Sequence, residues 1–304
     1  MSYLRYLESQ LASLNNEFVI ENISKLNGWS ESEVSSGNPL KNKYKIIKNL
    51  SARVIAEKTD VIITDCLSSY VSDTWYRESS ADAPTGKTME SFDDFYLGEI
   101  NELQLLAALY SNNVVNPSRQ LKKIVNLRDG VNYLFAGVND LTLSVKLIKH
   151  VHSIIGGQGL IDNAGKYRQK GARPAGASHR YLPPKEIKPR LAALVSFIGE
   201  SVAQSKSDIE LLCIASLFLA EFLFIHPFSN GNGRTARLIT NFILKKEFLV
   251  PFPLVSCKSD IYHSALAEYQ KSIRVFPNKI LNIILQALIL HYDRIMYSYC
   301  MSYS

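Results

Sequence analysis

The chain has little cysteine, and none of it is arranged for metal binding. Its four cysteines, Cys66, Cys213, Cys257 and Cys300, are scattered over 304 residues and form no CxxC pair. This spacing excludes a zinc knuckle and a disulfide framework, and it indicates a reducing compartment. With only 15 Gly and 11 Pro beside 46% hydrophobic residues, the chain is neither collagen-like nor disordered. Its length predicts one large domain or two small ones, with a core that needs no covalent crosslinks.

Long hydrophobic runs and targeting signals are also missing. The most apolar stretch, residues 211–225, is too short to span a bilayer and contains Glu221, so it predicts a buried core helix. The N-terminus lacks the basic region and the small-residue cleavage site of a signal peptide. We therefore expect a cytoplasmic protein with no membrane partner, while export into another cell by a route without such a signal stays open.

The net charge of +6 is divided unevenly along the chain. Residues 1–110 hold 10 Lys+Arg and 16 Asp+Glu, whereas residues 111–304 hold 24 and 12. The densest basic run, 166–190, has eight basic residues and one acid. Such a run is usually a solvated loop, and it can also border a site for an anionic ligand. Nucleic-acid binding ranks last, because no recognition helix or RNP-like aromatic pattern accompanies the run, and we expect no nucleic-acid partner.

Helical periodicity dominates the chain and predicts an all-α fold with one small β element. The predicted helices cover roughly 3–14, 44–72, 97–111, 118–136, 139–155, 186–204, 207–225, 233–246, 259–273 and 277–299. One β-hairpin is predicted within 165–183, where glycine and proline interrupt a polar stretch. Segment 73–96 is polar and contains both glycine and proline, so it predicts a linker or loop.

Residues 225–237, IHPFSNGNGRTAR, carry the strongest chemical signal. A helix should end at His226, because Pro227 disfavours helical backbone in the residue before it. Two glycines and two asparagines then predict a turn, after which a new helix begins. The start of a helix presents free backbone N–H groups to an anion, and Arg234 and Arg237 lie on one face of this helix. The spacing is neither a P-loop nor a Rossmann fingerprint, so it predicts a separate type of polyphosphate site.

This stretch resembles the Fic-domain signature HPFx(D/E)GNGRxxR. All fixed positions but one agree, at His226, Pro227, Phe228, Gly231, Asn232, Gly233, Arg234 and Arg237. The resemblance covers about 120–275 and implies an all-α, Fic-type helical bundle with a small β-hairpin flap. It divides the chain into an N-terminal regulatory or dimerising region (1–115), a Fic core domain (116–276) and a C-terminal helix (277–304).

The resemblance also implies a reaction. Proteins similar to this one transfer AMP from ATP to a hydroxyl of a target protein and release pyrophosphate. By position, His226 would be the general base that takes the proton of the attacking Ser, Thr or Tyr hydroxyl. The backbone amides of Gly231 to Gly233 and the Asn232 side chain would hold the α-phosphate. Arg234 and Arg237 would hold the β- and γ-phosphates.

The basic segment 165–183 takes the place of the family's flap, which pairs with the main chain of the target like an added strand. The resemblance implies three candidates for docking the target, namely Tyr167, Arg168 and Arg173. Asn241 and Tyr262 are candidates for contact with adenine. For these two a structural role is at least as strong an interpretation, because Tyr262 can be a packing aromatic and Asn241 can hydrogen-bond only to backbone.

Two departures from the family pattern bear on activity. Position 230 is Asn, where the family has an acidic residue that helps to hold Mg²⁺. An amide oxygen brings no charge, so the ion would be held weakly by Asn230 and mainly by the ATP phosphates. Many relatives also carry an inhibitory helix whose glutamate pairs with the second arginine of the motif. Ser72 stands at the matching position, which predicts a missing clamp, whereas with Glu78 as the alternative match inhibition would remain.

The resulting hypothesis is a protein adenylyltransferase that uses ATP with Mg²⁺, acts on target proteins and also modifies itself. One alternative keeps the fold and changes the donor to UTP, GTP or a phosphocholine nucleotide, because the motif reads phosphate and not the base. A second alternative is a catalytically weakened, ATP-binding regulatory module, in which Asn230 has cost the chain its activity. The N-terminal helices make a homodimer one expected assembly.

Overall fold

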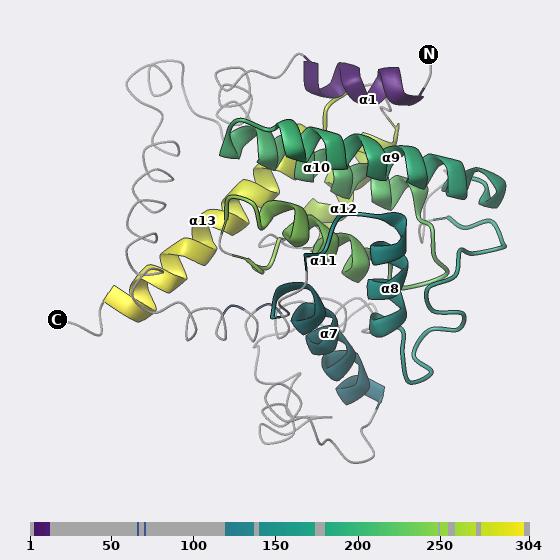
Figure 1. The fold of residues 1–304 in the computed structure, drawn as a ribbon, viewed down its shortest axis with the longest axis horizontal. Helices are drawn as coiled ribbons and strands as arrows, with labels where there is room; N and C mark the ends of the chain where they lie inside the picture. The colour runs from purple at the N-terminus through teal and green to yellow at the C-terminus, as the bar shows by residue number, and fades with distance from the viewer. Residues whose placement is uncertain are drawn as a thin grey trace.

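The computed structural model of the chain describes residues 3–12, 66, 70, 119–136, 140–173, 180–248, 250–254, 259–271 and 275–300. None of these residues lies in a strand and most are helical, so the all-α prediction is confirmed. The helices are α1 (Tyr3–Ala12), α7 (Arg119–Phe135), α8 (Val145–Ile155), α9 (Pro184–Gln204), α10 (Asp208–Ile225), α11 (Asn232–Leu244), α12 (Ser259–Lys271) and α13 (Asn278–Cys300) (Figure 1).

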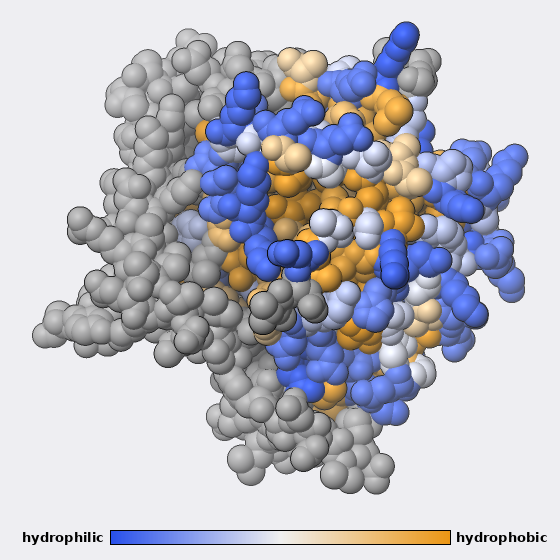
Figure 2. Space-filling model, viewed as in Figure 1, coloured by the Kyte–Doolittle hydropathy of each residue, from blue (hydrophilic) through white to orange (hydrophobic). Residues whose placement is uncertain are grey.

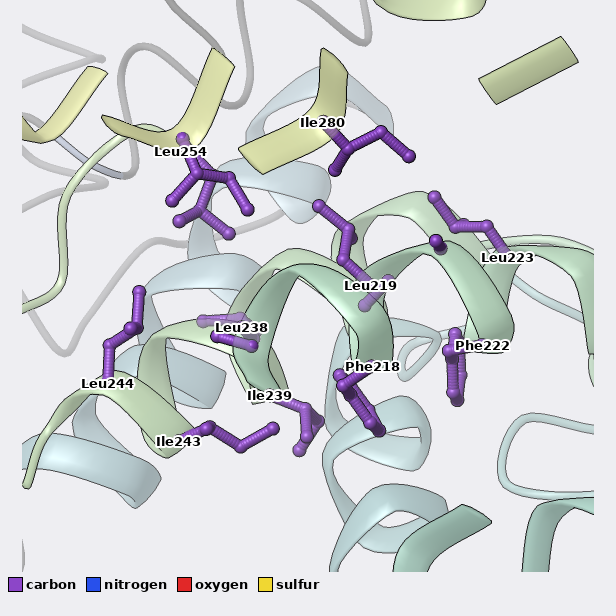
Figure 3. Close-up of a cluster of buried hydrophobic side chains, with 14 of the residues drawn as sticks. Phe218, Leu219, Phe222, Leu223, Leu238, Ile239, Ile243, Leu244, Leu254 and Ile280 are labelled. Atoms are coloured by element: carbon purple, nitrogen blue, oxygen red, sulfur yellow. The ribbon is translucent and has the colours of Figure 1, made fainter. Parts of the chain in front are cut away.

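Helix α10 is the centre of the fold. Its residues are almost all apolar and are buried on every side of the helix. Helices α9, α11, α12 and α13 pack against it (Figure 1). Figure 3 shows Phe218 of α10 in one cluster with Leu238 of α11 and Ile280 of α13. Ser207 caps the start of α10, because its hydroxyl accepts the Glu210 N–H at 3.1 Å and so satisfies one of the free amides there.

A buried carboxylate joins helix α1 to this centre. Glu221 of α10 is fully buried and accepts hydrogen bonds from the hydroxyls of Tyr3 at 2.7 Å and Tyr269 at 2.6 Å. The Tyr6 hydroxyl lies 2.7 Å from that of Tyr269, and the Arg190 guanidinium of α9 stacks 3.4 Å over the Tyr3 ring. Burial, followed by the Glu221 charge, raises the pKa of all three tyrosines. The hydroxyls therefore stay protonated and remain donors to the carboxylate.

Most helix boundaries agree with the prediction to within a few residues, and α8 is the exception. It was expected to begin near residue 139 and begins at Val145. Ser144 has an extended backbone, and its hydroxyl accepts the Leu147 N–H at 3.1 Å, which starts the helix later than its apolar pattern suggests.

Several predictions fall on parts of the chain outside the described residues. These are the linker 73–96, the helix 97–111, the inhibitory-helix positions Ser72 and Glu78, and most of the helix 44–72. From the last of these only Cys66 and Tyr70 are described, and both are helical and buried. The division into an N-terminal region and a Fic core therefore stays a prediction.

The predicted hairpin flap is covered in part. Residues 165–173 and 180–183 contain no strand. The Tyr181 N–H donates to the Ala172 carbonyl at 3.0 Å, which draws the two sides of the segment together. The tip, 174–179, lies outside the described residues, so the hairpin stays a prediction. Helix α9 then begins at Pro184, and proline suits the first turn of a helix because an N–H there would have no intrahelical acceptor.

The C-terminal helix α13 belongs to the same hydrophobic cluster as α10, through residues such as Ile284 and Leu288. In the part of the chain that the structure describes, no helix is long and apolar enough to cross a membrane. Figure 2 shows hydrophilic side chains around most of the described part of one face, with an apolar area near its middle.

Candidate active site

The turn between α10 and α11 is built around His226. As predicted, α10 ends there, with His226 as the C-cap in a left-handed conformation of φ 49° and ψ 60°. Its N–H donates to the Phe222 carbonyl at 2.9 Å, and Pro227 then leads the chain away from the helix. A left-handed backbone costs a non-glycine residue about 1–2 kcal/mol. The predicted base therefore sits at a strained position that other contacts must hold.

Arg168 supplies much of that support from the segment that precedes α9. Its backbone N–H donates to the Pro227 carbonyl at 3.0 Å. Its guanidinium donates to four further backbone carbonyls, those of Lys170 at 2.9 Å, Ile225 at 3.3 Å, His226 at 2.7 Å and Leu182. A cation that bonds the last carbonyls of a helix also complements the helix dipole. The Arg168 side chain is therefore buried and serves the turn, and target docking at this residue stays a prediction.

The imidazole of His226 is kept neutral and is covered on one face. The Tyr181 ring stacks on it, with centroids 3.8 Å apart and planes only 7° from parallel. Burial lowers the pKa of His226 to about 4, and the nearby Arg168 charge adds to the effect. The Leu223 carbonyl opposes this decrease of the pKa. The buried Nδ1 of His226 makes no well-formed hydrogen bond within the described residues. A neutral imidazole at pH 7 is able to accept a proton.

Asn232 closes the loop that follows His226. Its Oδ1 accepts the Phe228 N–H at 3.0 Å, and its Nδ2 donates to the Phe228 carbonyl at 2.8 Å. Both ends of the amide are thus used within the loop, and the Asn232 side chain is 2% exposed. Contact of this side chain with an α-phosphate stays a prediction, because only one of the two Nδ2 hydrogens is used in the loop. Its role is to fix the backbone that presents the amides.

Those amides lie at the start of α11. The first main-chain bond of this helix runs from the Thr235 N–H to the Gly231 carbonyl at 3.0 Å, so the amides of Asn232 and Gly233 have no acceptor within it. Gly231, at φ 74°, turns the chain into the helix with a backbone that favours glycine. Amides at a helix start, together with the positive end of the helix dipole, attract an anion.

The stretch that holds this turn matches a known family. Residues 142–244 match the family model described as the Fic/DOC family. Because of this match, we call residues 142–244 the Fic domain.

Curated relatives of the Fic domain have different donors in their names. The chain is 33% identical over 84 residues to the protein adenylyltransferase fic-1 of Caenorhabditis briggsae. It is 29% identical over 122 residues to a uridine 5'-monophosphate transferase of Xanthomonas campestris. These matches cover 27% and 38% of this chain but only 16% and 22% of the relatives, so the chain spans a small part of either protein.

A solved structure shows the same fold. It is a Fic-domain-containing signaling protein from Bacteroides thetaiotaomicron, with a TM-score of 0.61 and 18% sequence identity. The alignment covers 84% of this chain and 98% of that one. The likeness therefore extends beyond the residues that match the family model.

The two motif arginines of the Fic domain lie on α11. Arg234 and Arg237 are three residues apart, and both are 7% exposed. Their positive charges therefore lie beside the start of the helix and within the fold. The charge of Arg234 also reaches a neighbouring helix, where it helps to lower the pKa of His152 on α8.

The Fic domain does not present Asn241 to a ligand. The side chain is fully buried, and its Nδ2 donates to the carbonyls of Arg237 and Phe252, each at 3.1 Å. Its Oδ1 accepts the Phe252 N–H at 3.0 Å. The prediction of adenine contact is therefore wrong, and the alternative of backbone hydrogen bonding is confirmed. Tyr262 is buried on α12, so its contact with adenine stays a prediction.

Of the other flap candidates, the structure exposes only Arg173. Tyr167 is half-buried, its ring lies 6.2 Å from that of Phe228, and the Lys149 ammonium lies 4.8 Å above it. Tyr167 therefore packs against the loop, and target docking by Arg173 stays a prediction.

The loop offers little to a divalent cation. Asn230 is exposed, and its Oδ1 accepts the Gly231 N–H at 2.6 Å. Among the described residues there is no group of three or more His, Cys, Asp or Glu that could hold a metal ion. Magnesium prefers several oxygen ligands with carboxylates among them. Weak ligation of magnesium by Asn230 stays a prediction.

Two residues that the motif did not reveal adjoin the site. Tyr181 covers the His226 ring, and His152 lies under the loop, where its ring stacks on Phe228 at 3.7 Å. Neither belongs to the signature, and His152 is 78 residues from the backbone atom to which it bonds. The sequence signal for this packing is the run of small residues at 229–233, which allows other side chains to approach the loop closely.

Proposed function

We propose that the chain is a protein adenylyltransferase that moves AMP from ATP to a Ser, Thr or Tyr hydroxyl of a target protein. One observation carries the proposal, namely a neutral imidazole, His226, beside the free amides at the start of α11 in a Fic domain. Relatives named for adenylyl transfer support it. Cytoplasmic location and self-modification belong to the same proposal.

In the proposed reaction His226 is the general base. Because Nδ1 is buried, Nε2 is the ring nitrogen that takes the proton of the target hydroxyl. The hydroxyl oxygen then bonds to the α-phosphorus of ATP, the bond from this phosphorus to the bridging oxygen of the β-phosphate breaks, and pyrophosphate leaves. The imidazolium that results can return its proton to the solvent or to the product. A base with a pKa near 4 is free of protons at pH 7, which keeps it ready to act.

The start of α11 would stabilise the charge that builds on the α-phosphate. The amides of Asn232 and Gly233 are fixed before the substrate arrives, because the Asn232 side chain holds the loop. Donors fixed in this way typically contribute about 10²–10³ in rate. Arg234 and Arg237 would bind the β- and γ-phosphates through their forked donors. Magnesium would enter with the nucleotide.

Two alternatives rest on specific observations. The uridine 5'-monophosphate transferase among the relatives favours a second donor class, and nothing in the phosphate loop selects a base. Asn230 in place of an acid favours a nucleotide-binding module without transfer. Control by an N-terminal helix, with Ser72 or Glu78 at the inhibitory position, is proposed on the resemblance alone.

Mass spectrometry of the full chain after separate incubation with ATP and UTP tests the proposal. We expect a covalent addition of one AMP group from ATP, and no addition in the His226→Ala variant. Addition of UMP alone would establish the second donor class. If the wild type binds nucleotide but adds no group, and Asn230→Asp gains the transfer activity, the chain is a nucleotide-binding module and the proposal of an enzyme is rejected.

A further inference from the structure

His152 of α8 packs against the loop of residues 227–231 that precedes α11, which we call the phosphate loop. It is fully buried and uses both ring nitrogens. Its Nδ1 accepts the Gly165 N–H at 2.7 Å, and its Nε2 lies 2.9 Å from the Asn230 carbonyl. The two partners belong to different functional segments, since Gly165 starts the flap segment and Asn230 belongs to the loop before α11.

These two contacts fix the tautomer. An amide N–H can only donate, so Nδ1 must carry the lone pair, and the ring hydrogen is then on Nε2, where it donates to the Asn230 carbonyl. A doubly protonated ring would set Nδ1–H against the Gly165 N–H. Burial accordingly lowers the pKa of His152 to about 4, and the ring is neutral at pH 7.

The bond to Asn230 determines where an amide of the loop points. In a planar trans peptide the C=O and the following N–H point in opposite directions. Because His152 holds the Asn230 carbonyl toward α8, the Gly231 N–H is turned to the opposite side of the loop. In the structure the Asn230 Oδ1 accepts this N–H at 2.6 Å, so a bound anionic oxygen would take the place of this side-chain acceptor.

The loop is packed closely against the side chains of α8 and of the residues that follow this helix. The His152 ring stacks on Phe228, with planes 13° from parallel. A Cβ on Gly231 would lie 2.7 Å from the Ile161 side chain and 3.4 Å from the His152 Nε2. Gly165 is equally confined, since a Cβ there would lie 3.0 Å from the Lys149 carbonyl. Gly165, and Gly231 next to Asn230, therefore both lie in close contact with α8 or its side chains.

We propose that His152 is a positioning residue for the phosphate loop, which turns the Gly231 amide toward the bound anion by holding the Asn230 carbonyl. Through Gly165 it also ties the base of the flap segment to that loop. This role rests on the proposed function, because it presupposes that the loop binds a phosphate. The contacts themselves can be tested without any assumption about the transferred group.

Three variants separate the two hydrogen bonds. His152→Gln places an amide N–H near the Nε2 position and keeps a donor for the Asn230 carbonyl. His152→Asn places an amide oxygen near the Nδ1 position and keeps an acceptor for the Gly165 N–H. His152→Phe keeps the aromatic ring beside Phe228 and removes both bonds.

The first readout is the affinity of the full chain for tripolyphosphate, measured by calorimetry, since this probe carries no base. Loss of one positioned donor should weaken binding about tenfold. We expect this loss in His152→Asn and His152→Phe, and binding within about threefold of the wild type in His152→Gln. The second readout is amide hydrogen exchange in the peptides that cover 226–234 and 160–170. Exchange in 226–234 should quicken in His152→Asn and His152→Phe, and exchange in 160–170 in His152→Gln and His152→Phe.

Thermal unfolding of each variant separates positioning from a general loss of stability. Equal affinity and exchange in all four proteins would overturn the proposal. The proposal would also be overturned if the variants lost affinity only in proportion to their loss of thermal stability, with His152→Gln binding tripolyphosphate no more tightly than His152→Asn. If the wild type binds tripolyphosphate but transfers no nucleotide group, the proposed function fails while the comparison of variants still decides the role of His152. If the wild type does not bind tripolyphosphate, both proposals are rejected.

Discussion

Acid should destabilise the fold through the buried imidazole of His152. Burial lowers its pKa from 6.5 to about 4, the Arg234 charge adds to this shift, and the bond to the Asn230 carbonyl opposes it. The unfolded chain therefore binds the proton near pH 6.5 and the folded chain only near pH 4. The free energy of unfolding falls as the pH drops through this window and levels off below it. At pH 5 this one group should remove about 2 kcal/mol.

That loss is a large share of the stability of a typical domain, which is about 5–15 kcal/mol. Urea denaturation of the full chain at pH 7.5 and pH 5 measures it. Other groups titrate in the same window, including His226, so the quantity of interest is the difference between the wild type and His152→Gln. The variant should lose about 2 kcal/mol less than the wild type. His150→Gln, which removes an exposed imidazole two residues away, is the matched control. Equal losses in the wild type and His152→Gln would refute the reasoning.

Three further predictions concern single side chains. Asn232→Ala leaves the buried N–H and C=O of Phe228 without their partner, so urea denaturation should show a free energy of unfolding lower by about 2–4 kcal/mol. A decrease below about 1 kcal/mol would contradict the role of the Asn232 amide in holding the loop. Glu221→Ala leaves the tyrosine hydroxyls that bind α1 without their acceptor; we expect a loss of about 3–5 kcal/mol by the same assay, and an unchanged value would show that the cluster does not hold the helix. Tyr181→Ala uncovers one face of the His226 ring, so an NMR titration should find its pKa raised from about 4 toward 6.5, and an unmoved pKa would mean that the stacking does not bury the imidazole.

The helices and the turn at His226 could be predicted from the sequence because their causes are local. The apolar run of α10 and the effect of Pro227 on the residue before it need no knowledge of the rest of the fold. Amide groups at the start of α11 follow from the same local pattern. These features explain why the end of α10 and the start of α11 were predicted close to where they lie.

The side chains that hold the site could not be predicted, because their partners are distant in sequence. Arg168 lies in the most basic run of the chain, and nothing there shows that it folds inward onto carbonyls 57 and 58 residues away. Asn232 belongs to the motif, which favoured ligand binding, whereas for Asn241 the sequence left adenine contact and backbone hydrogen bonding both open. Their amide groups are used by Phe228 and Phe252, a pairing that only tertiary packing creates.

A crystal structure of the chain with bound ATP tests the central claim most directly. The account predicts the α-phosphate at the start of α11, within hydrogen-bonding distance of the Asn232 and Gly233 amides and with the His226 Nε2 facing the side from which a hydroxyl would attack. The β- and γ-phosphates should lie beside Arg234 and Arg237. A triphosphate bound elsewhere, with the imidazole still covered and turned away from it, would contradict the account.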